Sequence, residues 1–122
     1  MNAILMKAND DWKILNEKEI TLDTLQTAVN GYIEAVYLDD NIVMYCNENG
    51  LNLELPINRF ATSYGHFQKR IIGYIVGDVV FTKSDDAGNT VSLSNDEMNN
   101  IIDFIESYQN YTVEINSYRK GK

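Results

Sequence analysis

Residues 31–59 limit the folds open to this chain more than any other stretch, because apolar segments alternate there with turn residues. The segments span 32–38, 42–46 and 51–55, and they are separated by Asp-Asp-Asn and Asn-Glu-Asn-Gly sequences. An Asn-Gly pair tolerates the positive φ angles of a tight hairpin turn. The last segment alternates leucine with polar residues, which is typical of a strand with one buried face. The stretch therefore predicts a meander of three antiparallel strands.

The residues before the meander predict a hairpin and a short helix. Alternating apolar residues at 4–8 and a second segment at 12–17 are separated by an Asn-Asp-Asp turn. Thr21 is a suitable N-cap for a helix over about 22–29, with Asp23 in its first turn. Asn30-Gly31 then supplies a C-terminal stop. This helix is expected to lead directly into the meander.

The residues after the meander predict a loop and a buried strand. Residues 60–68 contain aromatic side chains without a clean period, so we expect an irregular connection there. Residues 71–82 form a nearly continuous β-branched apolar run, which indicates a strand covered on both faces. A short return strand at 90–93 is expected to pair with it.

The C-terminal part predicts an amphipathic helix. Ser94 and Glu97 have the spacing of a capping box, and a helix over about 95–109 would place Met98, Ile101, Ile102, Ile105 and Tyr108 on one stripe. Residues 111–115 are expected to add a last strand, followed by a basic tail. The 122 residues then form a single α+β domain, residues 1–122, built on one antiparallel sheet.

Charge and composition limit the classes of partner that the chain is expected to bind. The net charge of −8 argues against binding a phosphate backbone, and the ten basic residues are scattered. The acidity either keeps the protein soluble or imitates DNA. The single cysteine, Cys46, lies in an apolar run that favours a buried thiol. With no membrane-spanning apolar run and no signal-peptide pattern, we expect a cytoplasmic protein that binds neither nucleic acid nor membrane.

No reaction chemistry stands out. His66 is the only histidine, and a surface role without catalysis is favoured for it. No cluster of metal ligands and no phosphate-binding glycine loop is present in the sequence. We therefore expect no enzyme activity, no metal and no cofactor.

The parts of a nucleotide pocket are present instead. Such a pocket needs an aromatic ring for the base, amides for its edge and an arginine for phosphate. The candidate binding residues are Asn58, Arg59, Phe81, Asn89, Asn95 and Arg119. Each of these residues could instead have an ordinary structural role, such as a core position for Phe81.

The order of four short motifs carries a resemblance to a known family. VNGYIEAVYL, NENG, LPINR and IVGDVVF follow one another over about residues 22–82. This succession resembles a small domain of unknown function found in phages, plasmids and Gram-positive genomes. Within it, the length and the capped C-terminal helix are similar to the first type of Thoeris anti-defence proteins.

The resemblance implies a phage sponge that binds cyclic ADP-ribose isomers made by TIR-domain enzymes and leaves them intact. It also implies a homodimer or larger oligomer with pockets at subunit boundaries, and an ability of related members to hold cyclic oligonucleotides. An aromatic ligand contact carries over to Phe81, and an asparagine contact carries over to Asn95 or Asn89. The alternative is an acidic DNA mimic that inhibits a restriction or other nucleic-acid-binding protein.

Overall fold

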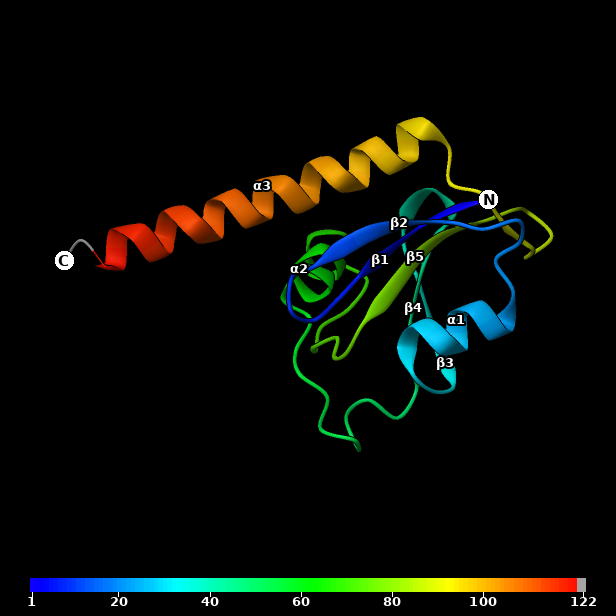
Figure 1. Ribbon diagram of the computed structural model, residues 1–122, viewed down its shortest axis with the longest axis horizontal. Helices are drawn as coiled ribbons and strands as arrows, with labels where there is room; N and C mark the ends of the chain where they lie inside the picture. The colour runs from blue at the N-terminus through cyan, green and yellow to red at the C-terminus, as the bar shows by residue number, and fades with distance from the viewer. Residues whose placement is uncertain (121–122) are drawn as a thin grey trace.

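The computed structural model describes the backbone of residues 1–120 and the side chains of residues 1–111 (Figure 1). The elements in chain order are β1 (Asn2–Met6), β2 (Trp12–Asn16), α1 (Leu22–Val29), β3 (Ile33–Tyr37), the 3-10 turn η1 (Asp39–Asn41), β4 (Ile42–Asn47), α2 (Arg59–Phe67), β5 (Val79–Ser84), β6 (Thr90–Val91) and α3 (Asn95–Lys120).

These strands form one antiparallel sheet in the order β2-β1-β5-β4-β3, with the short β6 also paired to β5. The predicted α+β class with a single antiparallel sheet is confirmed. β5 is the central strand, and its Val79, Val80 and Phe81 have no exposed surface. It was expected to be buried on both sides, and it is.

Helices cover both faces of the sheet (Figure 1). The larger core lies under α2 and α3, where Ile4, Met44 and Phe81 of the sheet meet Phe60, Ile101 and Ile105 of the helices. The smaller core lies under α1, where Leu5 and Val80 meet Leu25. Alternation along each central strand therefore supplies two apolar faces, as the period of two requires.

The third strand of the predicted meander does not form. β3 and β4 pair as expected, but residues 51–54 are a turn, and Leu51 and Leu53 are exposed. The other edge of β4 is paired with β5, so no position beside β4 is left for a local third strand. Residues 51–54 therefore form a turn despite their alternating pattern, because β5 pairs with the edge of β4 that a third strand would need.

A helix replaces the loop predicted at 60–68. α2 begins after Asn58, whose Oδ1 accepts a hydrogen bond from the Ala61 N–H at 3.1 Å. Phe60, Tyr64 and Phe67 recur at i, i+4 and i+7, which is the spacing of a helix face. The predicted strand at 71–82 is correspondingly shorter, because only residues from Val79 onward join the sheet.

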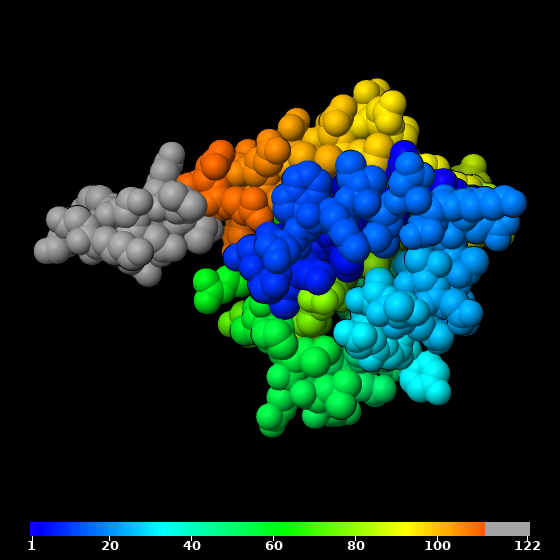
Figure 2. Space-filling model, viewed as in Figure 1, coloured from blue at the N-terminus to red at the C-terminus, as the bar shows by residue number. Residues whose placement is uncertain are grey.

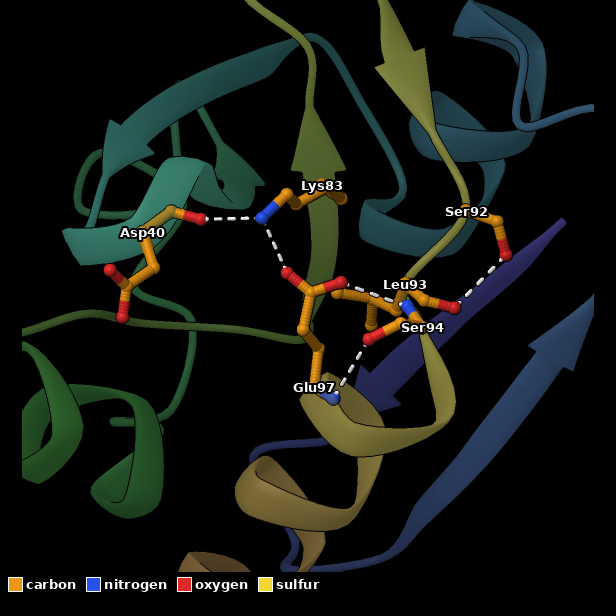
Figure 3. Close-up of polar contacts among 6 residues, drawn as sticks. All are labelled: Asp40, Lys83, Ser92, Leu93, Ser94 and Glu97. Atoms are coloured by element: carbon orange, nitrogen blue, oxygen red, sulfur yellow. Dashed lines mark hydrogen bonds and ion pairs between the residues drawn. The ribbon is translucent and has the colours of Figure 1, made fainter.

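The local signals at the other helix ends are confirmed. Thr21 caps α1 through the Thr24 N–H, and Asn30 ends it in the left-handed conformation. Ser94 and Glu97 form the predicted capping box at the start of α3 (Figure 3). The strand predicted at 111–115 is wrong, because α3 continues through those residues to Lys120 and extends past the sheet (Figure 1).

The Glu97 carboxylate also joins α3 to the sheet. It accepts from Lys83 of β5, and the same ammonium group donates to the Asp40 carbonyl at 2.8 Å (Figure 3). Partial burial acts to raise the pKa of Glu97, but the hydrogen bonds from Lys83 and Ser94 outweigh it and hold that pKa below its usual range.

We expect Glu97→Gln to lower the free energy of unfolding by about 1 kcal/mol at neutral pH. Because the folded-state pKa is depressed, this contribution is complete above the unfolded pKa of about 4.3 and is lost as pH falls through the folded pKa. Urea unfolding of wild type and variant at about pH 7 and about pH 3 measures the difference. If wild type and variant differ in unfolding free energy by the same amount at both pH values, the role of the charged carboxylate is contradicted.

Candidate functional site

An aromatic cleft runs between α2 and α3. It encloses about 320 Å³ and is lined by Phe60, Ser63, Tyr64, Phe67, Phe104, Ser107, Tyr108 and Tyr111. In Figure 2 the described part of α3, coloured yellow to orange, forms the upper rim of the molecule. Six of the eight lining residues are aromatic, so the cleft offers flat apolar surfaces with two serines between them.

The rings of the cleft form a connected set with a buried floor and an exposed rim. Phe60 and Tyr64 are 2% and 7% exposed, whereas Phe67 and Phe104 are 68% and 42% exposed. The Tyr64 and Phe104 rings meet edge to face at 5.4 Å, and the Phe67 and Phe104 rings lie 5.3 Å apart. Tyr111, 63% exposed, continues the rim along α3. The exposed Phe104 ring therefore packs on the buried Tyr64 ring, and Phe67 packs on Phe104.

One end of the cleft is acidic. A neighbouring groove of about 520 Å³ shares Tyr64, Phe67 and Phe104 with the cleft and adds Asp39, Asp40 and Asp103. Arg70 forms an ion pair with Asp39 there. Burial raises the pKa of Tyr64, a hydrogen bond with Gln68 partly opposes this, and the charges of Asp40 and Asp39 add to the rise. A negative potential therefore reaches the cleft from this end.

The other end lies at the N-terminus of α2. Phe60 contacts Tyr108, whereas Phe67 contacts Phe104, so the two helices run in opposite directions along the cleft. Arg59 is exposed and lies one helical turn before Ser63, which lines the cleft. Arg59 is thus one helical turn from the cleft lining, on the side farthest from the aspartates, although it does not itself line the cleft.

Two of the predicted binding residues belong to the interior. Phe81 is 0% exposed and packs against the rings of Phe60 and Tyr64 at 5.9 and 5.6 Å. It lies beneath the cleft floor, where no ligand reaches its ring. Asn58 is also 0% exposed, and its Nδ2 donates to the Met6 and Gly77 carbonyls, each at 3.0 Å. Its amide is fully used in holding α2 to the sheet.

The remaining predicted residues are dispersed. Asn89 closes the turn before β6, where its backbone and side-chain N–H groups donate to Asp85. Asn95 is exposed at the first position of α3. Arg119 lies beyond the residues whose side chains are described. Of the five predicted residues whose side chains are described, none lines the aromatic cleft, and Arg59 is one helical turn from its lining residue Ser63.

The residues considered for catalysis have structural surroundings. His66 is exposed, and its Nε2 lies 2.7 Å from the Gly73 carbonyl oxygen. Burial, followed by the charge of Glu34, raises the pKa of Cys46 to about 11, so this thiol stays protonated at neutral pH. Among the described side chains, no group of three or more metal-ligating residues gathers. No helix in the described part of the chain is both long and apolar enough to span a membrane.

A sequence model for a domain of unknown function, DUF3846, matches residues 1–109. The chain belongs to the DUF3846 family. This match begins before and ends after the resemblance predicted over 22–82, so it includes the first hairpin and the capped start of α3. No curated protein matches this DUF3846 chain, and no solved structure does.

Sequence reasoning missed most of the cleft in this DUF3846 domain. Ser63 and Phe67 lay in a segment interpreted as a loop, and Phe104 fell outside the stripe assigned to the core. The aromatic spacing at 60, 64 and 67 was the available signal for a helix that buries two rings and exposes the third.

Proposed function

We propose that this DUF3846 protein is a non-catalytic binding protein that sequesters a nucleotide signal in the cleft between α2 and α3. The observation that carries the proposal is the row of partly exposed rings in that cleft. Arg59 is one helical turn from the lining residue Ser63. Bases stack favourably on aromatic side chains, at about 1–3 kcal/mol per base.

The charge distribution orients the ligand. A phosphate or pyrophosphate is repelled by Asp39, Asp40 and Asp103 and attracted by Arg59, so the phosphate group points toward the start of α2. The base then lies over Phe104 and Phe67, with the hydroxyls of Ser63 and Ser107 available to its polar edge or to a ribose.

The resemblance to Thoeris anti-defence proteins makes cyclic ADP-ribose isomers the first ligands to test, followed by cyclic oligonucleotides. Such a ligand carries more than one phosphate, whereas Arg59 is one helical turn from the cleft lining and Arg70 is already paired with Asp39. A second copy of the chain, packed against the exposed rim of Phe104 and Tyr111, supplies further basic groups and closes the cleft. The working assembly in this proposal is a homodimer or larger oligomer.

Removing one ring or the cation is expected to weaken binding without unfolding the protein. Phe104→Ala and Arg59→Ala should each weaken the affinity for the tightest ligand about tenfold or more. Leu22→Ala, at a 56% exposed position on α1, is the matched control and should bind normally. Thermal stabilisation across a panel of cyclic nucleotides and ADP-ribose isomers, followed by calorimetry, measures the affinities. Equal affinities in all three variants would place the ligand elsewhere.

The acidic groove keeps a second function open. Asp39, Asp40 and Asp103 lie along one exposed groove, and the whole chain carries −8. In an acidic mimic of DNA, such carboxylates replace phosphates in the site of a nucleic-acid-binding protein. Binding to a basic protein that fades as salt is added, with no stabilisation by any nucleotide of the panel, would favour this function over sequestration.

A further inference from the structure

The sheet has an open edge at β3. Leu38 N–H donates to the Ile42 carbonyl and Glu48 N–H donates to the Tyr32 carbonyl, so even-numbered residues of this strand bond to β4. The N–H and C=O groups of Ile33, Ala35 and Tyr37 consequently point away from β4, since the directions alternate along a strand. β3 is the last strand in the sheet order, and none of its five residues is buried.

This edge carries little of the usual protection against further pairing, because Glu34 is its only charged residue. Edge strands are commonly guarded by lysine, proline or a bulge. Residues 31–38 contain no lysine, arginine or proline, and the β3–β4 register is continuous over five pairs. The opposite edge strand, β2, carries Lys13.

A cavity lies beside this edge, on the sheet face opposite α1. It encloses about 250 Å³, and Glu34 and Val36 of β3 line it together with Cys46 and Glu48. Glu34 is exposed and lies directly opposite Cys46 in the β3–β4 register, so its side chain lines the cavity beside the thiol. The cavity thus combines an apolar interior with two carboxylates, which suits a cationic group on an aliphatic stem.

Exposed apolar residues surround the same cavity. Leu51 and Tyr74, which line it, are 74% and 67% exposed, and Ile72 next to them is fully exposed. Residues 48–57 project from the body of the protein, as the green segment of Figure 2 shows. A group of exposed apolar residues of this kind is characteristic of a surface that contacts another protein.

We propose that β3 is a docking edge for an extended segment of a basic partner protein. The segment adds to the sheet as a further strand, bonded to the free backbone groups of Ile33, Ala35 and Tyr37. A lysine or arginine opposite Glu34 on that strand enters the cavity, where Glu34 and Glu48 neutralise it. The cavity shares no lining residue with the aromatic cleft, so this surface is independent of the proposed nucleotide site.

Charge favours a basic partner over a second copy at this edge. Each copy carries −8, and β3 itself contains Glu34 but no cation. Pairing two β3 strands would bring both pairs of carboxylates to one seam and leave both cavities without a positive group.

The test uses a capped heptapeptide with Val, Lys and Val on one face and Thr on the other, and the same peptide with Glu in place of Lys. We expect the Lys peptide to bind wild type at least about tenfold more tightly than the Glu peptide. Glu34→Lys should remove this preference, whereas Glu106→Lys, the same charge change on the exposed face of α3, should preserve it. Ala35→Pro should abolish binding, because proline removes an N–H that points away from β4.

Hydrogen exchange on the unaltered protein tests whether the peptide adds to β3, even if Ala35→Pro fails to fold. The amides of Ile33, Ala35 and Tyr37 should exchange rapidly in the free protein and slowly with the Lys peptide bound. Equal binding of the two peptides, binding without protection of these amides, or no binding at all would overturn the proposal. So would protection that rises with protein concentration alone, because a second copy would then occupy the edge.

Discussion

Replacing Phe81 with alanine is expected to lower the free energy of unfolding by about 4 kcal/mol. The ring has no exposed surface and packs against Phe60 and Tyr64 from the central strand of the sheet. Its removal leaves a cavity at the junction of β5 and α2, which close-packed neighbours fill only partly. Urea unfolding followed by circular dichroism measures the loss. Phe67→Ala, at a 68% exposed ring of the same cluster, is the matched control and should cost less than about 1 kcal/mol.

This experiment separates two roles for Phe81. If the ring were a ligand contact on the surface, Phe81→Ala would abolish ligand binding and leave the unfolding free energy within about 1 kcal/mol of wild type. We expect the opposite, a large loss of stability that accounts for any loss of binding. A stable Phe81→Ala variant that no longer binds would contradict the core position.

Asn58→Ala is expected to cost about 3 kcal/mol of unfolding free energy. The substitution removes the N-cap of α2, worth about 1 kcal/mol, and leaves the buried carbonyls of Met6 and Gly77 without their donor. Thr21→Ala removes a cap of the same type at the exposed start of α1 and should cost only about 1 kcal/mol. Chemical denaturation of both variants gives the comparison.

Asn58→Asp tests which half of the amide matters. Aspartate keeps the oxygen that caps α2 but replaces the donor with a second oxygen facing two carbonyls. We expect this variant to be at least as unstable as Asn58→Ala at neutral pH. If it instead unfolds like wild type, the cap alone explains Asn58 and the two carbonyl contacts contribute nothing measurable.

Local signals in the sequence were sufficient for several elements. Thr21 and Asn30 bound α1 correctly, and Ser94 with Glu97 located the start of α3, because a cap depends on residues only three or four positions apart. The turn at 39–41 likewise joined two strands that pair as neighbours. In these places the local preference and the tertiary structure agree.

Pairing between strands far apart in the sequence determined the structure where local patterns were ambiguous. The alternating leucines at 51–55 fit a strand, but the edge of β4 that they would need belongs to β5, more than thirty residues later in the chain. The segment at 60–68 was interpreted as a loop because its aromatic residues look irregular until Asn58 is recognised as a cap. A single sequence does not show directly which distant strand will pair with a given strand edge.

The candidate site was predictable only in its chemical parts. An aromatic ring and an arginine were expected, and Arg59 is one helical turn from Ser63 in a cleft lined by rings, although Arg59 does not itself line it. The rings that are exposed there, Phe67 and Phe104, come from two helices that meet through tertiary packing. The resemblance carried a ligand contact over to Phe81, but Phe81 belongs to the apolar run at 71–82 and lies in the core.

We propose that the α2–α3 cleft holds a nucleotide signal and leaves it intact. The most direct measurement incubates the protein with a cyclic ADP-ribose isomer, removes free ligand by gel filtration, denatures the protein and identifies the released compound by mass spectrometry. We predict stoichiometric release of unchanged ligand from wild type and little or none from Phe104→Ala. Release of a hydrolysed product, or equal retention of ligand by the two proteins, would contradict the claim.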